Sequence, residues 1–177
     1  MGSIIVPEHK LRDIVSKMPQ VDYGGTNGLR TIQFGWGDKK QLNKYLALKK
    51  DDSYPLIWLL NPRPKTCKAN QSLVERDCNL VIATLESRKD MNSMERFDAS
   101  FDIILNPITD LIFQGIGSAT TTRFLNDDEQ VVNDFPDYSD DANSNSSGVI
   151  ALWDAIRIDC KIEFNNSCLK NIKWITQ

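Results

Sequence analysis

Apolar residues recur along the chain at two kinds of spacing, one typical of helices and the other of strands. Residues 7–18 carry apolar side chains three and four positions apart between two prolines, which predicts a short amphipathic helix. Asp38 is suited to cap a second short helix, in which Leu42 and Leu46 share one face. Between these helices, residues 22–37 hold several glycine-containing turn signals and predict an irregular loop or hairpin.

The longest helical pattern covers residues 93–112, where apolar residues follow one another three and four positions apart. Pro107 lies inside this pattern, where it removes a backbone N–H and collides with the carbonyl group four residues earlier. We therefore expect a kink, or two helices that meet near Asn106. Gly115 and Gly117 follow, and they are expected to end the helix.

Three segments have the pattern of β-strands. Residues 54–60 are apolar on both faces, as expected for a central strand covered on two sides. Residues 78–85 are rich in β-branched side chains and should pair with that strand, with residues 61–77 as the connection. Residues 154–164 alternate strictly between an apolar and a polar face. The polar face of this last strand consists of Arg157, Asp159, Lys161 and Glu163.

The order of these elements predicts an α+β fold in a single domain spanning residues 1–177. We expect a mainly antiparallel β-sheet with helices packed on one face. Within residues 118–147, seven acidic side chains lie between positions 127 and 141 with no basic one among them, followed by a run of Asn and Ser. Such a stretch predicts a long acidic polar loop or arm, the most mobile element of the chain.

Composition narrows the class of protein. The 177 residues are 41% hydrophobic and 25% charged, values of an ordinary globular chain that exclude collagenous, wholly disordered and coiled-coil proteins. The longest apolar run, residues 56–60, is far shorter than the roughly 20 residues that span a bilayer. The first residues lack the basic and long apolar regions of a signal peptide, so we expect the chain to fold in a cytoplasm.

Charge is distributed unevenly along the chain, although the net charge is only −3. Residues 1–89 carry 15 Lys and Arg against 9 Asp and Glu, whereas residues 90–177 carry 6 against 15. If the halves form separate surfaces, this division favours head-to-tail association or docking to oppositely charged partners; a fold that interleaves them would remove it. The lysines of residues 39–50 form a basic cluster, but with a sequence pI of about 5.2 we interpret it as a solvated helix face.

The residue types that catalysis or metal binding requires are sparse. The single histidine, His9, lies in the first predicted helix, and none of the four cysteines has CxxC spacing. The glycine clusters match no phosphate-binding motif, and residues 137–141 lack the glycine and glutamate of a calcium loop. We therefore expect four reduced thiols, no cofactor, no metal and no enzymatic activity. The cysteines are Cys67, Cys78, Cys160 and Cys168.

One enzymatic alternative stays open. Pro136-Asp137, followed by Asp159-Cys160-Lys161, resembles the PD-(D/E)xK signature of metal-dependent nucleases. In that chemistry two carboxylates hold Mg²⁺, and a lysine on the same strand face helps to activate water. Alternation places Asp159 and Lys161 on one face, whereas Pro136-Asp137 falls in the predicted acidic loop. A solvated strand face is the simpler interpretation.

Two strings accompany the predicted order of elements: Tyr-Pro-Leu-Ile-Trp at 54–58 in the first strand and Leu-Asn-Pro-Ile at 105–108 in the long helix. Over most of residues 5–165, strings and order together resemble the tail completion (tail terminator) proteins of tailed bacteriophages, especially those of Bacteroidetes hosts. The resemblance implies a tail-terminator-like α+β domain that assembles as a ring, usually sixfold, at the head-proximal end of the tail. It implies a structural role without catalysis, and it also allows a neck ring or connector between portal and tail.

The resemblance also implies partners: other copies of the chain, the tail tube, neck or portal-associated proteins, and DNA that passes through the lumen without specific binding. The setting would be a virion assembled in the host cytoplasm. Because a ring needs two dissimilar lateral faces, we expect interfaces at the acidic loop and at the polar strand face. The alternatives are a solvated loop and strand, and a cytosolic adaptor unrelated to phage. The expected interface residues are Asp127, Asp128, Glu129, Asp134, Asp137, Asp140, Asp141, Arg157, Asp159, Lys161 and Glu163.

Overall fold

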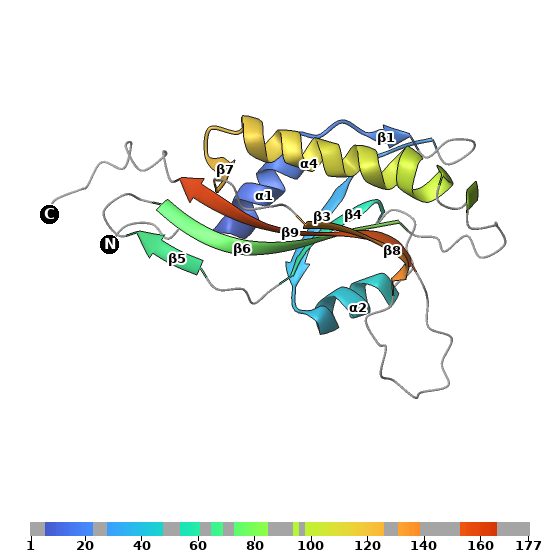
Figure 1. Cartoon of the computed structure of the whole chain (residues 1–177), viewed down its shortest axis with the longest axis horizontal. Helices are drawn as coiled ribbons and strands as arrows, with labels where there is room; N and C mark the ends of the chain where they lie inside the picture. Colours follow the sequence, from blue (N-terminus) through green and yellow to red (C-terminus); the bar gives the residue numbers. More distant parts are fainter. Residues whose placement is uncertain are drawn as a thin grey trace, which may run out of the picture.

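The computed structural model describes residues 6–22, 28–47, 54–60, 65–68, 73–84, 94–95, 98–125, 131–138 and 153–165 (Figure 1). Its elements, in chain order, are α1 (Pro7–Val15), β1 (Val21–Asp22), β2 (Leu29–Arg30), β3 (Gln33–Gly37), α2 (Lys39–Ala47), β4 (Leu56–Leu60), β5 (Lys65–Lys68), β6 (Leu73–Ala83), the π-helical η2 (Asp98–Leu105), α4 (Asn106–Ser118), β7 (Thr122–Phe124), β8 (Val131–Tyr138) and β9 (Trp153–Asn165). The predicted α+β class is confirmed.

Strands β6 and β9 form the centre of a seven-stranded sheet. They pair antiparallel along their whole overlap, from Leu73 opposite Asn165 to Ala83 opposite Ala155. Each of these long strands shares its outer edge between two shorter ones: β4 and β5 lie along β6, and β7 and β8 lie along β9, all antiparallel. Strand β3 adds a parallel pair beyond β4, and β1 pairs with β2 in a separate hairpin. The sheet is therefore mixed, with antiparallel pairs in the majority among the described strands.

Helices cover both faces of the sheet, so the expectation of helices on one face is wrong. In Figure 1, α1 and α4 lie on one side of the sheet and α2 lies on the other. Leu42 and Leu46 of α2 are buried against Trp58 and its neighbours in β4, β6 and β9. The physical reason is visible in β4, where every residue of Leu56–Leu60 is buried. A strand that is apolar on both faces has to be covered on both, and α2 supplies the second cover.

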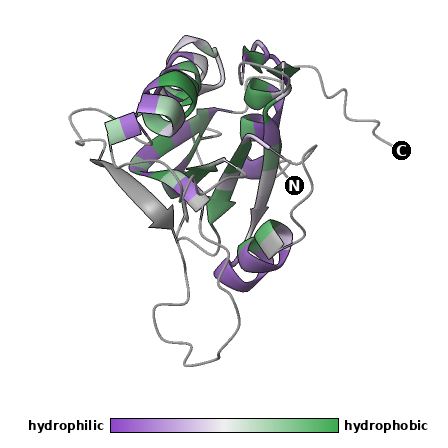
Figure 2. Ribbon diagram, turned by 90° about the vertical axis from the view of Figure 1, so that its right-hand side faces the viewer, coloured by the Kyte–Doolittle hydropathy of each residue, from purple (hydrophilic) through white to green (hydrophobic). Residues whose placement is uncertain are grey.

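The main core lies between the sheet and the layer formed by α1, η2 and α4. It contains Leu11 of α1, Phe101 of η2 and Ile112 of α4, together with the inward side chains of β4, β6 and β9, all at most 9% exposed. Figure 2, coloured by hydropathy, shows green strands within the sheet and a largely purple α2. The large core and the smaller one under α2 sandwich the same strands.

The long helical segment divides where Pro107 predicts it. The π-helical η2 ends at Leu105 and α4 begins at Asn106, with the proline in its first turn, where a missing N–H is tolerated. The glycines do not end α4, which continues to Ser118. Gly115 instead allows close approach of α1, because a Cβ there would meet Cγ2 of Ile14 at 2.6 Å.

Residues 118–147 do not form the one long loop that the sequence predicts. They contain β7 and β8, and both strands pair with β9. Strand β8 is rich in Asp, Asn and Pro, residue types that are depleted in strands. Its register shifts between Phe135 and Tyr138, the stretch that contains Pro136, and a proline is accepted at such an irregularity. Residues 126–130 and 139–147 of the expected loop lie outside the described residues.

The glycine-rich segment at 22–37 contributes a strand of the sheet as well as the expected hairpin. Gly35 of β3 lies opposite Trp58 of β4, and a Cβ at this glycine would meet the indole ring at 2.5 Å. The indole Nε1 of Trp58 donates a hydrogen bond to the carbonyl oxygen of Gly37 at 3.3 Å. The glycine therefore makes room for the tryptophan that anchors β3 to β4.

Candidate interaction surface

The polar residues predicted for the last strand do share one face of β9. The antiparallel register places polar residues of β6 and β7 beside them: Asp77 lies opposite Lys161, and Asn79 lies opposite Asp159. Helix α2 covers only the end of this sheet face that contains Ala83 and Ala155. We call the remainder the polar face, defined by Asp77, Asn79, Arg123, Arg157, Asp159, Lys161 and Glu163.

Asp159 organises the centre of the polar face. Its carboxylate accepts a hydrogen bond from Nδ2 of Asn79. Nη2 of Arg157 lies 3.2 Å from its Oδ1 and 3.1 Å from its Oδ2. Asn79 is 1% exposed, so this side chain depends on the protein for its hydrogen bonds. Among the described residues, Asn79 Oδ1 and Arg157 Nε are buried without a partner. Asp159 is thus an internal anchor of the face as well as a surface group.

Glu163 and Arg123 form the second contact of the polar face. Nε of Arg123 donates to Oε1 of Glu163 at 2.6 Å, and Glu163 is buried, whereas the Arg123 side chain is largely exposed. The hydrogen bond and the charge of Glu163, with a further contribution from Glu75, raise the pKa of Arg123 above its usual value. The strand face is therefore only partly solvated, since Lys161 is exposed and Glu163 is not.

A pocket of about 260 Å³ adjoins this ion pair, at the end of the sheet where β7 follows α4. Three consecutive threonines line it, together with Arg123 and Glu163. The hydroxyl of Thr122 donates to the carbonyl oxygen of Ile116 at 2.9 Å, so that this threonine closes the turn after α4. The pocket is therefore lined by this turn and by the Arg123–Glu163 ion pair.

The acidic residues expected in the loop have different positions in the structure. Asp134 and Asp137 belong to β8. Asp127, Asp128, Glu129, Asp140 and Asp141 lie outside the described residues.

The residues of the nuclease-like motif are not brought together. Asp159 lies opposite Val131 in the register of β8 and β9, whereas Asp137 falls between Phe135, opposite Ala155, and Tyr138, opposite Trp153. At about 3.3 Å per residue this separation is roughly 20 Å along the strands, and carboxylates that share one Mg²⁺ must each approach it to about 2 Å. Asp159 and Lys161 do lie on one face, as predicted.

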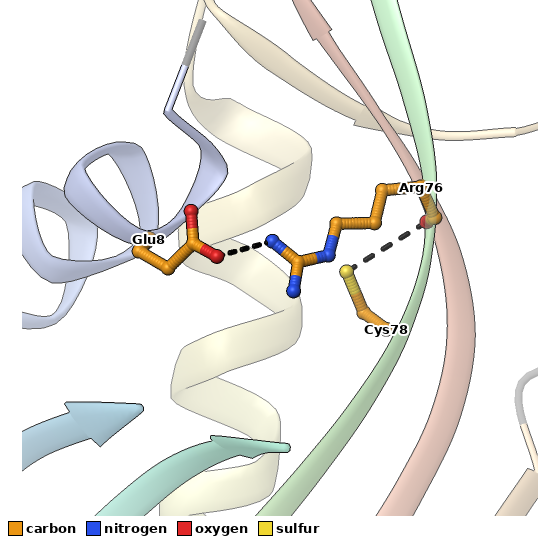
Figure 3. A network of polar contacts seen from close by, with 3 residues as sticks. All are labelled: Glu8, Arg76 and Cys78. Atoms are coloured by element: carbon orange, nitrogen blue, oxygen red, sulfur yellow. Dashed lines mark hydrogen bonds and ion pairs between the residues drawn. The ribbon is translucent and has the colours of Figure 1, made fainter. Parts of the chain in front are cut away.

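The other chemistry-bearing residues are buried under α1. Nη1 of Arg76 on β6 donates to Oε1 of Glu8 on α1 at 2.6 Å, and the arginine is 4% exposed (Figure 3). Cys78 lies beside this pair, directly opposite Cys160 on β9, and both are free thiols. Burial raises the pKa of Cys160 to about 12 and that of Cys78 still further. Both cysteines are thus protonated core residues and poor nucleophiles.

Sequence reasoning missed Asn79, Arg123 and the Glu8–Arg76 pair. Alternation within β6 puts Asn79 and Asp77 on one face and Arg76 on the other, but only the pairing register identifies their partners. His9 is exposed, and its ring contacts Trp36 edge-on at 6.2 Å between centroids. In the described part of the chain, no group of three His, Cys, Asp or Glu side chains is placed to hold a metal ion.

None of the described helices is long and apolar enough to cross a membrane. Comparison with known proteins finds no matching family model, no matching curated protein and no matching solved structure.

Proposed function

We propose that the protein is a structural component of a tailed-bacteriophage virion. It would assemble into an oligomeric ring at the head–tail junction, where it joins or terminates the tail tube beneath the neck. The partners of this ring would be further copies of the chain, the tail tube and the neck or portal-associated proteins. The order of elements and the two short strings that resemble tail completion proteins support this proposal.

The structural observation that carries the proposal is the chemical difference between the two sides of the sheet. One side is covered by α1, η2 and α4, and the other presents α2 and the polar face. Rings close through heterologous contacts, in which two different patches of one subunit meet. A protomer with two unlike sides has the surfaces that such contacts require.

The test is the mass of the purified protein in solution, measured by light scattering at several concentrations and salt levels, with negative-stain electron microscopy of the largest species. We expect a species of about six subunits, or growth towards one with concentration, and ring-shaped particles. A 20.1 kDa monomer under every condition, with no rings, would contradict the proposal.

A Mg²⁺-dependent nuclease of the PD-(D/E)xK type is the alternative. The separation of Asp137 from Asp159 along β8 and β9 removes the contact that would favour it. An incubation of the protein with DNA and Mg²⁺ distinguishes the two functions. Cleavage that is lost in both Asp159→Ala and Lys161→Ala, but kept in the nearby Asp77→Ala, would support the nuclease.

A further inference from the structure

Two helical surfaces on opposite sides of the sheet carry opposite charge. Helix α2 contains three exposed lysines and no acidic residue. From residue 98 to residue 118, η2 and α4 contain three exposed aspartates and no basic residue. We call these the basic surface, defined by Lys39, Lys40 and Lys44, and the acidic surface, defined by Asp98, Asp102 and Asp110.

Packing determines the direction in which each surface points. Leu42 and Leu46 are 0% exposed beneath α2, so Lys40 and Lys44, one turn apart, lie on its outward side. Ile108 and Ile112 are likewise 0% exposed beneath α4, and Asp110 lies on the side away from them. Both charged surfaces therefore face away from the sheet, in opposite directions.

This arrangement prevents the two surfaces of one protomer from meeting each other. The sheet and both cores lie between α2 and α4, as Figure 1 shows. A second copy, in contrast, can bring its acidic surface to the basic surface of the first. Ile103, which is 58% exposed beside Asp102, would add an apolar contact inside the charged rim.

We infer that copies of this chain associate head to tail, with the acidic surface of η2 and α4 on one copy docked on the basic surface of α2 on the next. The inference rests on the proposed function for its requirement that the protein self-associates, and it names the surfaces that would do so. The contact is heterologous, so it repeats from copy to copy, and the rotation between neighbours determines whether the assembly closes.

The test uses two charge-reversed variants of the full chain. Lys40→Glu/Lys44→Glu makes both surfaces acidic, and Asp102→Lys/Asp110→Lys makes both basic. We expect each variant alone to self-associate about tenfold more weakly than wild type, or worse, because like charges then face each other. An equimolar mixture should associate again, because each acidic surface then finds a basic one.

A matched control reverses the same number of charges elsewhere. Arg12→Glu/Lys17→Glu changes one exposed basic residue of α1 and one in the turn that follows it, and should leave self-association unchanged. Wild-type association should also weaken between about 0.1 M and about 1 M salt, where the Debye length falls from about 10 Å to about 3 Å. The readouts are sedimentation velocity for mass and circular dichroism for folding.

The outcomes separate the inference from the proposed function. If wild type assembles and both variants assemble equally well, or if the mixture of folded variants fails to recover, the docking surfaces are wrong and the ring can still be right. If wild type is monomeric throughout, both fail. If Lys40→Glu/Lys44→Glu abolishes binding of a random-sequence DNA duplex but leaves self-association intact, the basic surface binds nucleic acid and the inference is overturned.

Discussion

Strand β9 presents two faces that differ in burial and in the kind of contact that they make. Towards α1, η2 and α4, its residues Ile156, Ile158, Ile162 and Phe164 are 0% exposed. On the other side, Arg157 and Asp159 are half-buried and form an ion pair with each other, and Lys161 is exposed. Adjacent positions of one strand therefore differ: the covered face supplies apolar burial to the core, and the polar face carries charged side chains, several of them at the surface.

The largest expected effect comes from truncating a side chain of the covered face. Phe164→Ala should lower the free energy of unfolding by about 4 kcal/mol, because it removes a buried ring and leaves a cavity. Lys161→Ala, on the opposite face of the same strand, should lower it by less than about 0.5 kcal/mol. Urea unfolding of both variants measures the difference. Equal losses of unfolding free energy would show that the two faces contribute equally to stability.

The ion pair of Glu8 and Arg76 tests whether the covered face tolerates charge. Glu8→Ala leaves the 4% exposed Arg76 without its partner and should lower the free energy of unfolding by about 3 kcal/mol. Glu8→Ala/Arg76→Met should lower it less than Glu8→Ala does, because no unpaired charge is then buried. A double variant less stable than Glu8→Ala would mean that the pair itself stabilises the fold.

Asp159 probes the part of the polar face that is internal. Asp159→Ala removes the acceptor of Asn79 Nδ2. Because this buried amide group then lacks its hydrogen bond, the free energy of unfolding should fall by about 2 kcal/mol. The matched variant Asp77→Ala, an exposed aspartate of the same face, should change it by less than about 0.5 kcal/mol. Thermal unfolding of the two variants compares them, and similar effects would indicate a uniformly solvated face.

The buried thiols predict a fall in stability at alkaline pH. Burial raises the pKa of Cys160 from 9.0 to about 12, so in this range the unfolded chain loses the thiol proton and the folded chain keeps it. The stability that comes from the buried, protonated thiols is fully present below pH 9 and is lost as pH rises towards 12. At about pH 10, each thiol has lowered the free energy of unfolding by about 1.4 kcal/mol. Cys78→Ala/Cys160→Ala should show a shallower fall in unfolding free energy over this range, and an unchanged slope would contradict the assignment.

The smallest effect concerns the cap of α2. The N–H of Gln41 donates to Oδ1 of Asp38 at 2.8 Å, and Oε1 of Gln41 accepts from the N–H of Asp38 at 2.9 Å, so the two residues cap the helix reciprocally. Asp38→Ala should lower the free energy of unfolding by about 1 kcal/mol, whereas Asp38→Asn should keep most of the wild-type stability. A result in which both variants are as stable as wild type would show that burial of Leu42 and Leu46 alone holds α2.

Elements with strong local patterns could be predicted. The helical spacing of residues 7–18, the apolar run of β4, the alternation of β9 and the break at Pro107 all appear in the structure. Burial acts on each side chain through its position in the helix or strand period, and that period is local. The same alternation correctly placed Arg157, Asp159 and Lys161 on one face.

Elements that depend on a distant partner could not be predicted. Strands β3, β7 and β8 are short, glycine-containing or polar, and they are strands because β4 or β9 offers a free edge. The contacts of the polar face have the same origin, since Asn79 meets Asp159 across 80 positions of sequence. The position of Asp137 far from Asp159 likewise follows only from the register of β8.

The sequence by itself determined the α+β class, the main core segments, the capping of α2 and the separation of basic and acidic residues between the two halves of the chain. Only the tertiary structure decided that α2 covers the second face of the sheet, which residues pair across strands, and that the basic and acidic helical surfaces point in opposite directions. The reason is that spacing and composition act over a few residues, whereas the side on which a helix packs and the partner of a strand depend on contacts between distant segments.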